Sequence, residues 1–211
     1  MSIENQIEKR IGGWWWPKAD TEAWVAINGE VGDIDTIMHF AKFPGTVIQA
    51  GGNCGMWPKR YAEIFRNVIS AEPDPVNFEC LRRNTEGVHN IQIMNLAFGD
   101  KPGMTDIEVR WDVNRGANRL AVGDKTPVIT IDSLKADACD LLQLDVEGYE
   151  HLALLGAEKT IKAFKPTIVL ELKGHGEHYG YTDEETINYV NSLGYKLAHV
   201  LRTDHIFVPL P

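Results

Sequence analysis

The 211-residue sequence has few cysteines and no long apolar run. Cys54, Cys80 and Cys139 are far apart and include no Cys-x-x-Cys pair, which argues against a disulfide framework and against a zinc site. We expect these thiols to be reduced and packed in the interior. The longest apolar segments, such as residues 141–146, fall far short of the ~18 residues that a membrane-spanning helix needs. No membrane span is therefore expected.

Basic residues are also scarce, since 21 Lys and Arg stand against 30 Asp and Glu and the formal net charge is -9. A chain with this charge repels polyanions unless its basic residues cluster, so we expect no bulk nucleic-acid binding and no membrane binding. With 44% hydrophobic and 24% charged residues, the composition is that of a globular chain of one domain. Residues 1–10 are polar and lack the apolar core of a secretion signal, which predicts a cytoplasmic protein.

Short β-rich segments alternate with segments of helical periodicity along most of the chain. Strands are predicted at residues 46–50, 67–71, 91–97, 140–145, 167–172, 195–200 and 205–208, and helices at 33–43, around 61–65, at 76–84 and at 150–164. Thr182 and Glu185 fit a capping box that opens one more helix, which Gly194 ends. Between residues 103 and 133, two β-like stretches at 106–111 and 128–131 surround a turn-rich segment and predict a hairpin-like excursion.

This alternation predicts an α/β fold with a doubly wound, mostly parallel sheet of seven strands, covered by helices on both faces. The last two strands are joined by a short turn, so one strand near the C-terminus must be antiparallel. Such sheets bind ligands beyond the carboxyl ends of their strands, beside the point where the strand order reverses. The site is therefore expected near Gly51, Glu72, Ala97, Asp145 and Glu171.

A glycine-rich loop, Gly51-Gly-Asn-Cys-Gly55, directly follows the first strand of this alternation. Its backbone allows close approach, and its N–H groups are expected to hold the anionic end of a ligand. The loop does not fit Gly-x-Gly-x-x-Gly, and a plain tight turn is the alternative. Glu72 follows about 20 residues later, at a strand end where a carboxylate can accept hydrogen bonds from both hydroxyls of a ribose. The pattern fits NAD and S-adenosylmethionine equally.

Several motifs together resemble the FkbM-type methyltransferases, which use S-adenosylmethionine and have a Rossmann-like sheet. The likeness is carried by Val47–Gly55, Ala71–Phe78 with Leu81–Asn84, Thr130–Leu134, Leu144–Glu150, Leu155–Ala157 and Lys165–Glu171. It implies that Gly51, Gly52 and Asn53 hold the methionine portion of the cofactor and that Glu72 holds the ribose. The turn from Asn95 to Ala97 would lie along the adenine. The predicted cofactor-binding set is completed by Gly55, Pro73 and Asp145.

The resemblance also implies which residues carry the chemistry. Asp145 and Glu147 match the Asp-x-Glu-Gly signature of the family and would face the sulfonium and the acceptor. The predicted catalytic residues are Asp145, Glu147, Glu171 and His175, with Asp145, Glu147 or His175 as the base that removes a hydroxyl proton. His175 and His178 beside Glu171 could instead hold a divalent ion with Asp145, but the spacing is not a diagnostic metal motif, and solvated loop histidines are the alternative.

The leading hypothesis is a methyltransferase that uses S-adenosylmethionine to O-methylate a sugar or another small hydroxylated acceptor, with the acceptor class implied by the resemblance. Gln49 stands where the family commonly has Asp, and Gln143 where it commonly has Lys. These two departures keep a catalytically impaired cofactor-binding or scaffold protein as an alternative. An NAD-dependent dehydrogenase is favoured only by the glycine loop and Glu72.

Four of the six tryptophans, Trp14, Trp15, Trp16 and Trp24, lie outside the resemblance. Residues 1–45 are predicted to be an N-terminal Trp-rich extension and helix that act as a cap or lid over the acceptor, and residues 46–211 to be the methyltransferase domain. Simple burial of the tryptophans against a core is the alternative. Arg110, Arg115 and Arg119 bracket a turn at 114–118 and could place positive charge at the mouth of the pocket, although such arginines are usually solvated.

Overall fold

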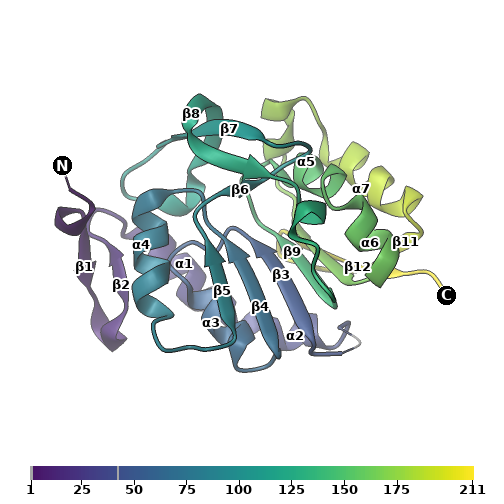
Figure 1. The fold of residues 1–211 in the computed structure, drawn as a ribbon, viewed down its shortest axis with the longest axis horizontal. Helices are drawn as coiled ribbons and strands as arrows, with labels where there is room; N and C mark the ends of the chain where they lie inside the picture. Colours follow the sequence, from purple (N-terminus) through teal and green to yellow (C-terminus); the bar gives the residue numbers. More distant parts are fainter. Residues whose placement is uncertain (1, 42) are drawn as a thin grey trace.

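The computed structural model describes residues 2–41 and 43–211, and Met1 and Lys42 lie outside the described residues. Its central sheet has the strand order β11-β12-β10-β9-β3-β4-β5 (Figure 1). The strands are β3 (Thr46–Ala50), β4 (Asn67–Ala71), β5 (Ile91–Met94), β9 (Leu141–Leu144), β10 (Thr167–Glu171), β11 (Tyr195–Leu201) and β12 (Asp204–Pro209). Only β12 runs antiparallel to its neighbours in this sheet, as far as the described residues show. The predicted mostly parallel sheet is therefore confirmed.

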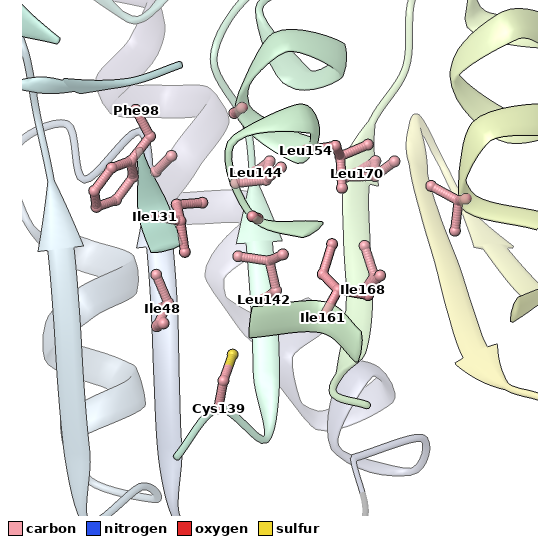
Figure 2. Packing of buried hydrophobic residues seen from close by; sticks show 14 of the residues in the cluster. Ile48, Phe98, Ile131, Cys139, Leu142, Leu144, Leu154, Ile161, Ile168 and Leu170 are labelled. Atoms are coloured by element: carbon pink, nitrogen blue, oxygen red, sulfur yellow. The ribbon is translucent and has the colours of Figure 1, made fainter. Parts of the chain in front are cut away.

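Helices cover both faces of the sheet because alternate side chains of each strand point to opposite faces. On one face, Ile48 and Leu142 pack with helices α5 (Glu150–Leu155), α6 (Glu158–Phe164) and α7 (Asp183–Ser192). Figure 2 shows this interior around Ile161 and Ile168. On the other face, the strands pack with α2 (Ile34–Met38) and α3 (Met56–Ala62). Helix α4 (Pro75–Asn84) lies beside β5 (Figure 1).

The excursion forms a second sheet beyond the carboxyl end of the first (Figure 1). It contains β6 (Ala97–Phe98), β7 (Gly103–Glu108) and β8 (Arg119–Ile129), in the order β6-β8-β7, with the 3-10 helix η4 (Arg115–Ala117) before β8. The hairpin-like pairing of β7 with β8 confirms the prediction. The single strand predicted at 91–97 is wrong, because Asn95 turns the chain off the sheet between β5 and β6. The turn-rich segment predicted between the β-like stretches 106–111 and 128–131 is also too long, because β8 already begins at Arg119.

The N-terminal region forms a small hairpin and one helix that the sequence pattern did not predict. Its elements are η1 (Ile3–Asn5), β1 (Ile7–Lys9), η2 (Ile11–Gly13), β2 (Trp15–Pro17), α1 (Glu22–Glu30) and η3 (Val31–Asp33). The helix predicted at 33–43 is shorter, because α2 ends at Met38. There, the ring of His39 makes a hydrogen bond with the Asp35 carbonyl oxygen, an acceptor of the last helical turn.

Several local predictions are confirmed. The hydroxyl of Thr182 accepts a hydrogen bond from the Glu185 N–H, and the Glu185 carboxylate accepts one from the Thr182 N–H, which completes the capping box of α7. The remaining 3-10 helices are η5 (Ile131–Leu134) and η6 (His175–Tyr179). All three cysteines are free and buried. Within residues 2–41 and 43–211, no helix has both the length and the apolar character to cross a membrane.

Candidate active site

A cleft of about 390 Å³ opens at the carboxyl ends of β3, β4, β9 and β10. Parallel strands present their carboxyl ends at one edge of the sheet, and the sequence predicted the site at this edge. Of the predicted site residues, those that line the cleft are Gly51, Asn53, Glu72, Pro73, Ala97, Asp145, Glu147, Glu171 and His175. Gly52, Gly55 and Asn95 are not among its lining residues.

Gly51 sets the shape of the cleft floor. Its φ is +86°, and a Cβ there would lie 1.9 Å from the carbonyl oxygen of Asp145. The N–H groups of Gly51 and Gly52 both donate to the Ala71 carbonyl at 3.0 Å. These two N–H groups are therefore paired within the protein, and the prediction that the N–H groups of this loop hold the anionic end of a ligand stays a prediction for the others. The two paired groups fasten the loop to β4.

The other two glycines of the loop serve packing. A Cβ on Gly52 would lie 2.5 Å from the Ser70 hydroxyl oxygen, and one on Gly55 would lie 2.9 Å from Cδ1 of Leu81. Both glycines thus let the loop and the start of α3 lie close against β4 and α4. Their predicted role in cofactor binding stays a prediction, and neither glycine lines the cleft.

Glu72 is buried at the end of β4, and its carboxylate faces the loop. Its two oxygens accept hydrogen bonds from the N–H groups of Asn53 at 2.7 Å and Asp74 at 2.8 Å. Burial, reinforced by the nearby Asp74 charge, raises the pKa of Glu72 to about 8. Each carboxylate oxygen can accept a second hydrogen bond, so Glu72 retains acceptor sites for the hydroxyls of a ribose.

Asn95 does not line the cleft, in contrast to the prediction that it lies along an adenine. Its side-chain amide donates to the carbonyl oxygens of Glu72 and Pro73, at 2.9 and 3.2 Å. The cleft wall there is formed by Leu96, Ala97 and Phe98. An apolar wall beside Glu72 can pack against the flat face of a nucleobase.

A chain of charged side chains runs through the other end of the cleft. His175 Nδ1 lies 2.8 Å from one oxygen of Glu147, and Lys173 Nζ lies 3.0 Å from the other. Lys173 also lies 2.6 Å from Glu171. Oxygens of Asp145, Glu147 and Glu171 lie within 4.8 Å of one another. The structure thus brings all four predicted catalytic residues together.

The turn that carries Glu147 has an unusual backbone. Glu147 has a φ of 55°, which is rare for a residue with a side chain, and Gly148 follows with a φ of 101°. A Cβ on Gly148 would lie 2.4 Å from the His175 carbonyl oxygen. The Glu-Gly pair therefore lets the loop that bears His175 pack directly on this turn, within hydrogen-bonding reach of Glu147.

Asp145 is in an environment that favours its protonated form. Burial raises the pKa of Asp145 well above its ordinary value, and the charge of Glu171 raises it further. Burial by itself would also raise the pKa of Glu171. The hydrogen bond from Asp145 and the ammonium of Lys173 outweigh this effect and lower the pKa of Glu171. A raised pKa favours the protonated form of Asp145, and a protonated carboxyl cannot accept a proton as a general base.

The three carboxylates could in principle offer oxygen ligands to a divalent ion. The ammonium of Lys173, however, already contacts Glu147 and Glu171, and His178 is not part of the group. A metal ion among these carboxylates would have to displace Lys173. We therefore assign no metal to this site.

Replacing Lys173 with Met should lower the free energy of unfolding by about 1–3 kcal/mol at pH 7.5, because two carboxylates would lose their shared cation. Lys173 lowers the pKa of Glu171 in the folded protein, so its stabilising effect is present at neutral pH and is lost as the pH falls. The penalty should therefore shrink towards pH 4. Urea denaturation at both pH values measures it. Lys162→Met, which removes an exposed partner of Glu158, should have a much smaller effect on stability.

The roof of the cleft comes from α1 and η4. Ala23, Ala26, Ile27 and Glu30 of α1 line the cleft, but Trp14, Trp15 and Trp16 do not. Trp16 is fully buried, and its ring centroid lies 5.1 Å from that of Trp24. The tryptophans thus bury against the hairpin and α4, which was the alternative in the sequence analysis. The part of the N-terminal region that reaches the site is α1.

Gln49 and Gln143 are buried opposite each other on β3 and β9. The Ser70 hydroxyl donates to the side-chain oxygen of Gln49 at 3.0 Å. Neither glutamine lines the cleft. The two substitutions change the polar interior of the sheet.

Sequence reasoning missed several residues that line the cleft. They are Asp74, Asn77, Asn118, Tyr149 and Lys173. Asp74 precedes the proline that begins α4, so a helix-capping signal marked its position but not its contact with Arg115. Lys173 lies two residues after Glu171 in a strand continuation, a spacing that places both side chains on one face.

Fold and site together define a class of protein. Six parallel strands with an antiparallel β12 inserted beside the last of them, a glycine loop after β3 and an acid at the end of β4 are the arrangement of S-adenosylmethionine-dependent methyltransferases. The family model "Methyltransferase FkbM domain" matches residues 58–197. The chain belongs to this family, and the dehydrogenase alternative is set aside.

Solved structures support this fold. The FkbM methyltransferase from Methylobacillus flagellatus is similar with a TM-score of 0.55 and 22% identity, over 78% of this chain and 43% of that one. The chain thus spans less than half of that protein. Magnesium protoporphyrin IX methyltransferase from Synechocystis, solved with bound S-adenosylmethionine, has a TM-score of 0.51 and 11% identity over 88% and 80% of the two chains. An rRNA methylase from Streptococcus thermophilus has a TM-score of 0.52 and 11% identity over 84% and 93%. No curated protein matches the sequence.

The cofactor that the family uses fits the residues present. The cleft volume lies within the range of small-molecule pockets. Gly51 lines the floor without a side chain, Glu72 offers carboxylate oxygens, and Leu96 to Phe98 offer an apolar wall. Glu72, Pro73 and Ala97 would hold the nucleoside, and Gly51, Asn53 and Asp145 would surround the remainder.

Proposed function

We propose that the protein is an O-methyltransferase that acts on a sugar or another small hydroxylated acceptor in the cytoplasm. S-adenosylmethionine supplies a methyl group that is already activated on a sulfonium. The protein has to align the acceptor hydroxyl with that methyl group and to accept the hydroxyl proton. The buried free thiols fit a reducing compartment.

The observation that carries the proposal is the hydrogen bond between His175 and Glu147 at the cleft. In this proposal Nδ1–H donates its hydrogen bond to Glu147, so that Nε2 is the nitrogen that can take up a proton. Among the described residues, Nε2 has no hydrogen-bond partner. His175 is therefore the proposed base, and Glu147 positions it. Asp145, whose pKa burial raises, contributes polar contact in this proposal.

The acceptor class follows from the side chains at this end of the cleft. Glu30, Glu171, Lys173 and His175 line it with hydrogen-bond acceptors and donors that are spaced for several hydroxyls. Lys173 and His175 already pair with Glu147, and a hydroxylated acceptor can add hydrogen bonds to these side chains that an apolar acceptor cannot make. A polyhydroxylated small molecule satisfies them. Helix α1 is proposed to cover this acceptor in place of the tryptophans.

A calorimetric titration with S-adenosylhomocysteine tests the cofactor half of the proposal. Ionised Glu72 accepts ribose hydroxyls better than protonated Glu72, and its pKa is about 8. Affinity should therefore rise by about fivefold between pH 7 and pH 8. Glu72→Gln should bind at least about tenfold more weakly at pH 8.5 and should lose this pH dependence.

Glu79→Gln serves as the control, because Glu79 lies on α4 and pairs with Arg82 and Arg83 outside the cleft. It should bind like the wild type. Absence of binding by the wild type would overturn the proposal. Binding without labelled methyl transfer to any member of a panel of mono- and disaccharides would favour the impaired alternative.

A further inference from the structure

A short turn of the excursion lies across the cleft, and we call residues 114–118 the strap. A Cβ on Gly116 would lie 3.2 Å from the Ala23 Cβ and 3.5 Å from the Asn53 side-chain nitrogen. The strap therefore covers the glycine loop closely and contacts α1. All five of its residues line the cleft.

Asp74 holds the strap. One of its oxygens accepts hydrogen bonds from Arg115 Nη2 at 2.5 Å and from Asn118 Nδ2 at 2.7 Å. The other oxygen accepts from the Val76 N–H at 2.7 Å and caps α4. The Asp74 N–H donates to the Glu72 carboxylate. The strap is thus connected through two residues to the position proposed for the ribose.

A second buried acid joins the strap to the N-terminal region. Asp20 accepts hydrogen bonds from the N–H groups of Arg115 at 2.8 Å and Ala23 at 3.0 Å. The carbonyl oxygen of Val113, just before the strap, accepts from the N–H groups of Thr21 and Glu22. Three distant parts of the chain therefore meet above the cleft in one hydrogen-bonded network.

This network contains three buried polar atoms without a hydrogen-bond partner among the described residues. They are the side-chain oxygens of Asn77 and Asn118 and the Nε of Arg115. Asn77 also uses its amide nitrogen to hold the strap, at 3.3 Å from the Arg115 carbonyl oxygen. Unpaired buried polar atoms are unfavourable. Three such atoms in one network beside a cleft indicate a polar ligand that forms hydrogen bonds with them.

We propose that the strap is a cofactor-binding element in which Arg115 and Asn118, together with Asn77, bind the nucleoside half of S-adenosylmethionine. The inference rests on the proposed function. The unpaired atoms comprise one donor and two acceptors, and a nucleoside presents both kinds of group on its base and its hydroxyls. A purely anionic ligand would leave the two amide oxygens unpaired. Asp74 acts as a positioning residue that orients Arg115 and Asn118.

Calorimetric titration with S-adenosylhomocysteine and with 5′-methylthioadenosine tests the strap. Asn118→Ala and Arg115→Ala should each weaken both ligands by about tenfold, which corresponds to about 1.4 kcal/mol. Asp74→Asn keeps a good helix cap but loses its charge, and it should weaken both ligands similarly. Lys125→Ala, at an exposed position of strand β8 that follows the strap, should leave both affinities unchanged. Thermal unfolding of the ligand-free variants reports any general loss of structure.

The outcomes separate this inference from the proposed function. If the wild type binds both ligands and the three strap variants bind with wild-type affinity, the strap assignment fails and the proposed function stands. If only S-adenosylhomocysteine binding weakens, the strap contacts the amino-acid half and the nucleoside assignment is overturned. If the wild type binds neither ligand, the proposed function fails and this inference fails with it.

Discussion

His175→Ala should reduce the rate of labelled methyl transfer to the best saccharide acceptor by about 100-fold to 10,000-fold, the range typical for loss of a general base. Binding of S-adenosylhomocysteine should stay within about twofold of the wild type, because His175 lies at the acceptor end of the cleft. The two measurements are a radiolabel transfer assay and a calorimetric titration. Added imidazole should restore part of the rate, since a small base can enter the space that the side chain leaves.

The matched control for this prediction is His178→Ala. His178 lies in the same 3-10 helix, but it packs against Tyr179 at a ring-centroid distance of 4.8 Å and does not line the cleft. This variant should transfer methyl groups like the wild type. Glu147→Gln keeps a hydrogen-bonding side chain but loses the charge that orients the imidazole, so kcat should fall more than KM changes. An unchanged rate in His175→Ala would refute the assignment of the base.

The inner strands β3, β9 and β10 were predictable because each is a buried, largely apolar run between turn residues. Thr46–Ala50 and Asn67–Ala71 have the predicted bounds, and glycine or proline follows each within a few residues. Helix α1 was not predicted, since its apolar residues run consecutively from Ala23 to Ile27 instead of recurring at helical spacing. Its position depends on contacts with Asp20 and η4, which periodicity does not encode.

In the site, too, some positions follow from local sequence pattern and others depend on contacts between distant parts of the chain. Glu72, Asp145 and Glu171 were predictable because parallel topology gathers strand ends at one edge. The contact of Arg115 with Asp74 joins positions that lie 41 residues apart, and it exists only because the excursion folds back over the cleft. Since most arginines beside a turn are solvated, no local pattern distinguished Arg115 from Arg110 or Arg119.

Gly51→Ala should lower the free energy of unfolding by about 3–5 kcal/mol, a large part of the stability of a typical domain. Two effects add. The residue has a φ of +86°, where an L side chain is strained, and the new Cβ would lie 1.9 Å from the Asp145 carbonyl oxygen. Neither backbone segment can easily move, because β3 and β9 are paired up to Ala50 and Leu144 in the middle of the sheet.

Urea denaturation of three alanine variants measures this effect against internal controls. Gly29→Ala should be neutral or slightly stabilising, because Gly29 lies in α1 with nothing within 4 Å of its added Cβ. Gly52→Ala should fall between the two, since its nearest neighbour is the Ser70 hydroxyl, which can rotate. The expected order of destabilisation is Gly51, then Gly52, then Gly29. If Gly51→Ala were as stable as the wild type, the close approach of the loop to Asp145 would be wrong, and the cleft floor built on it would have to be redrawn.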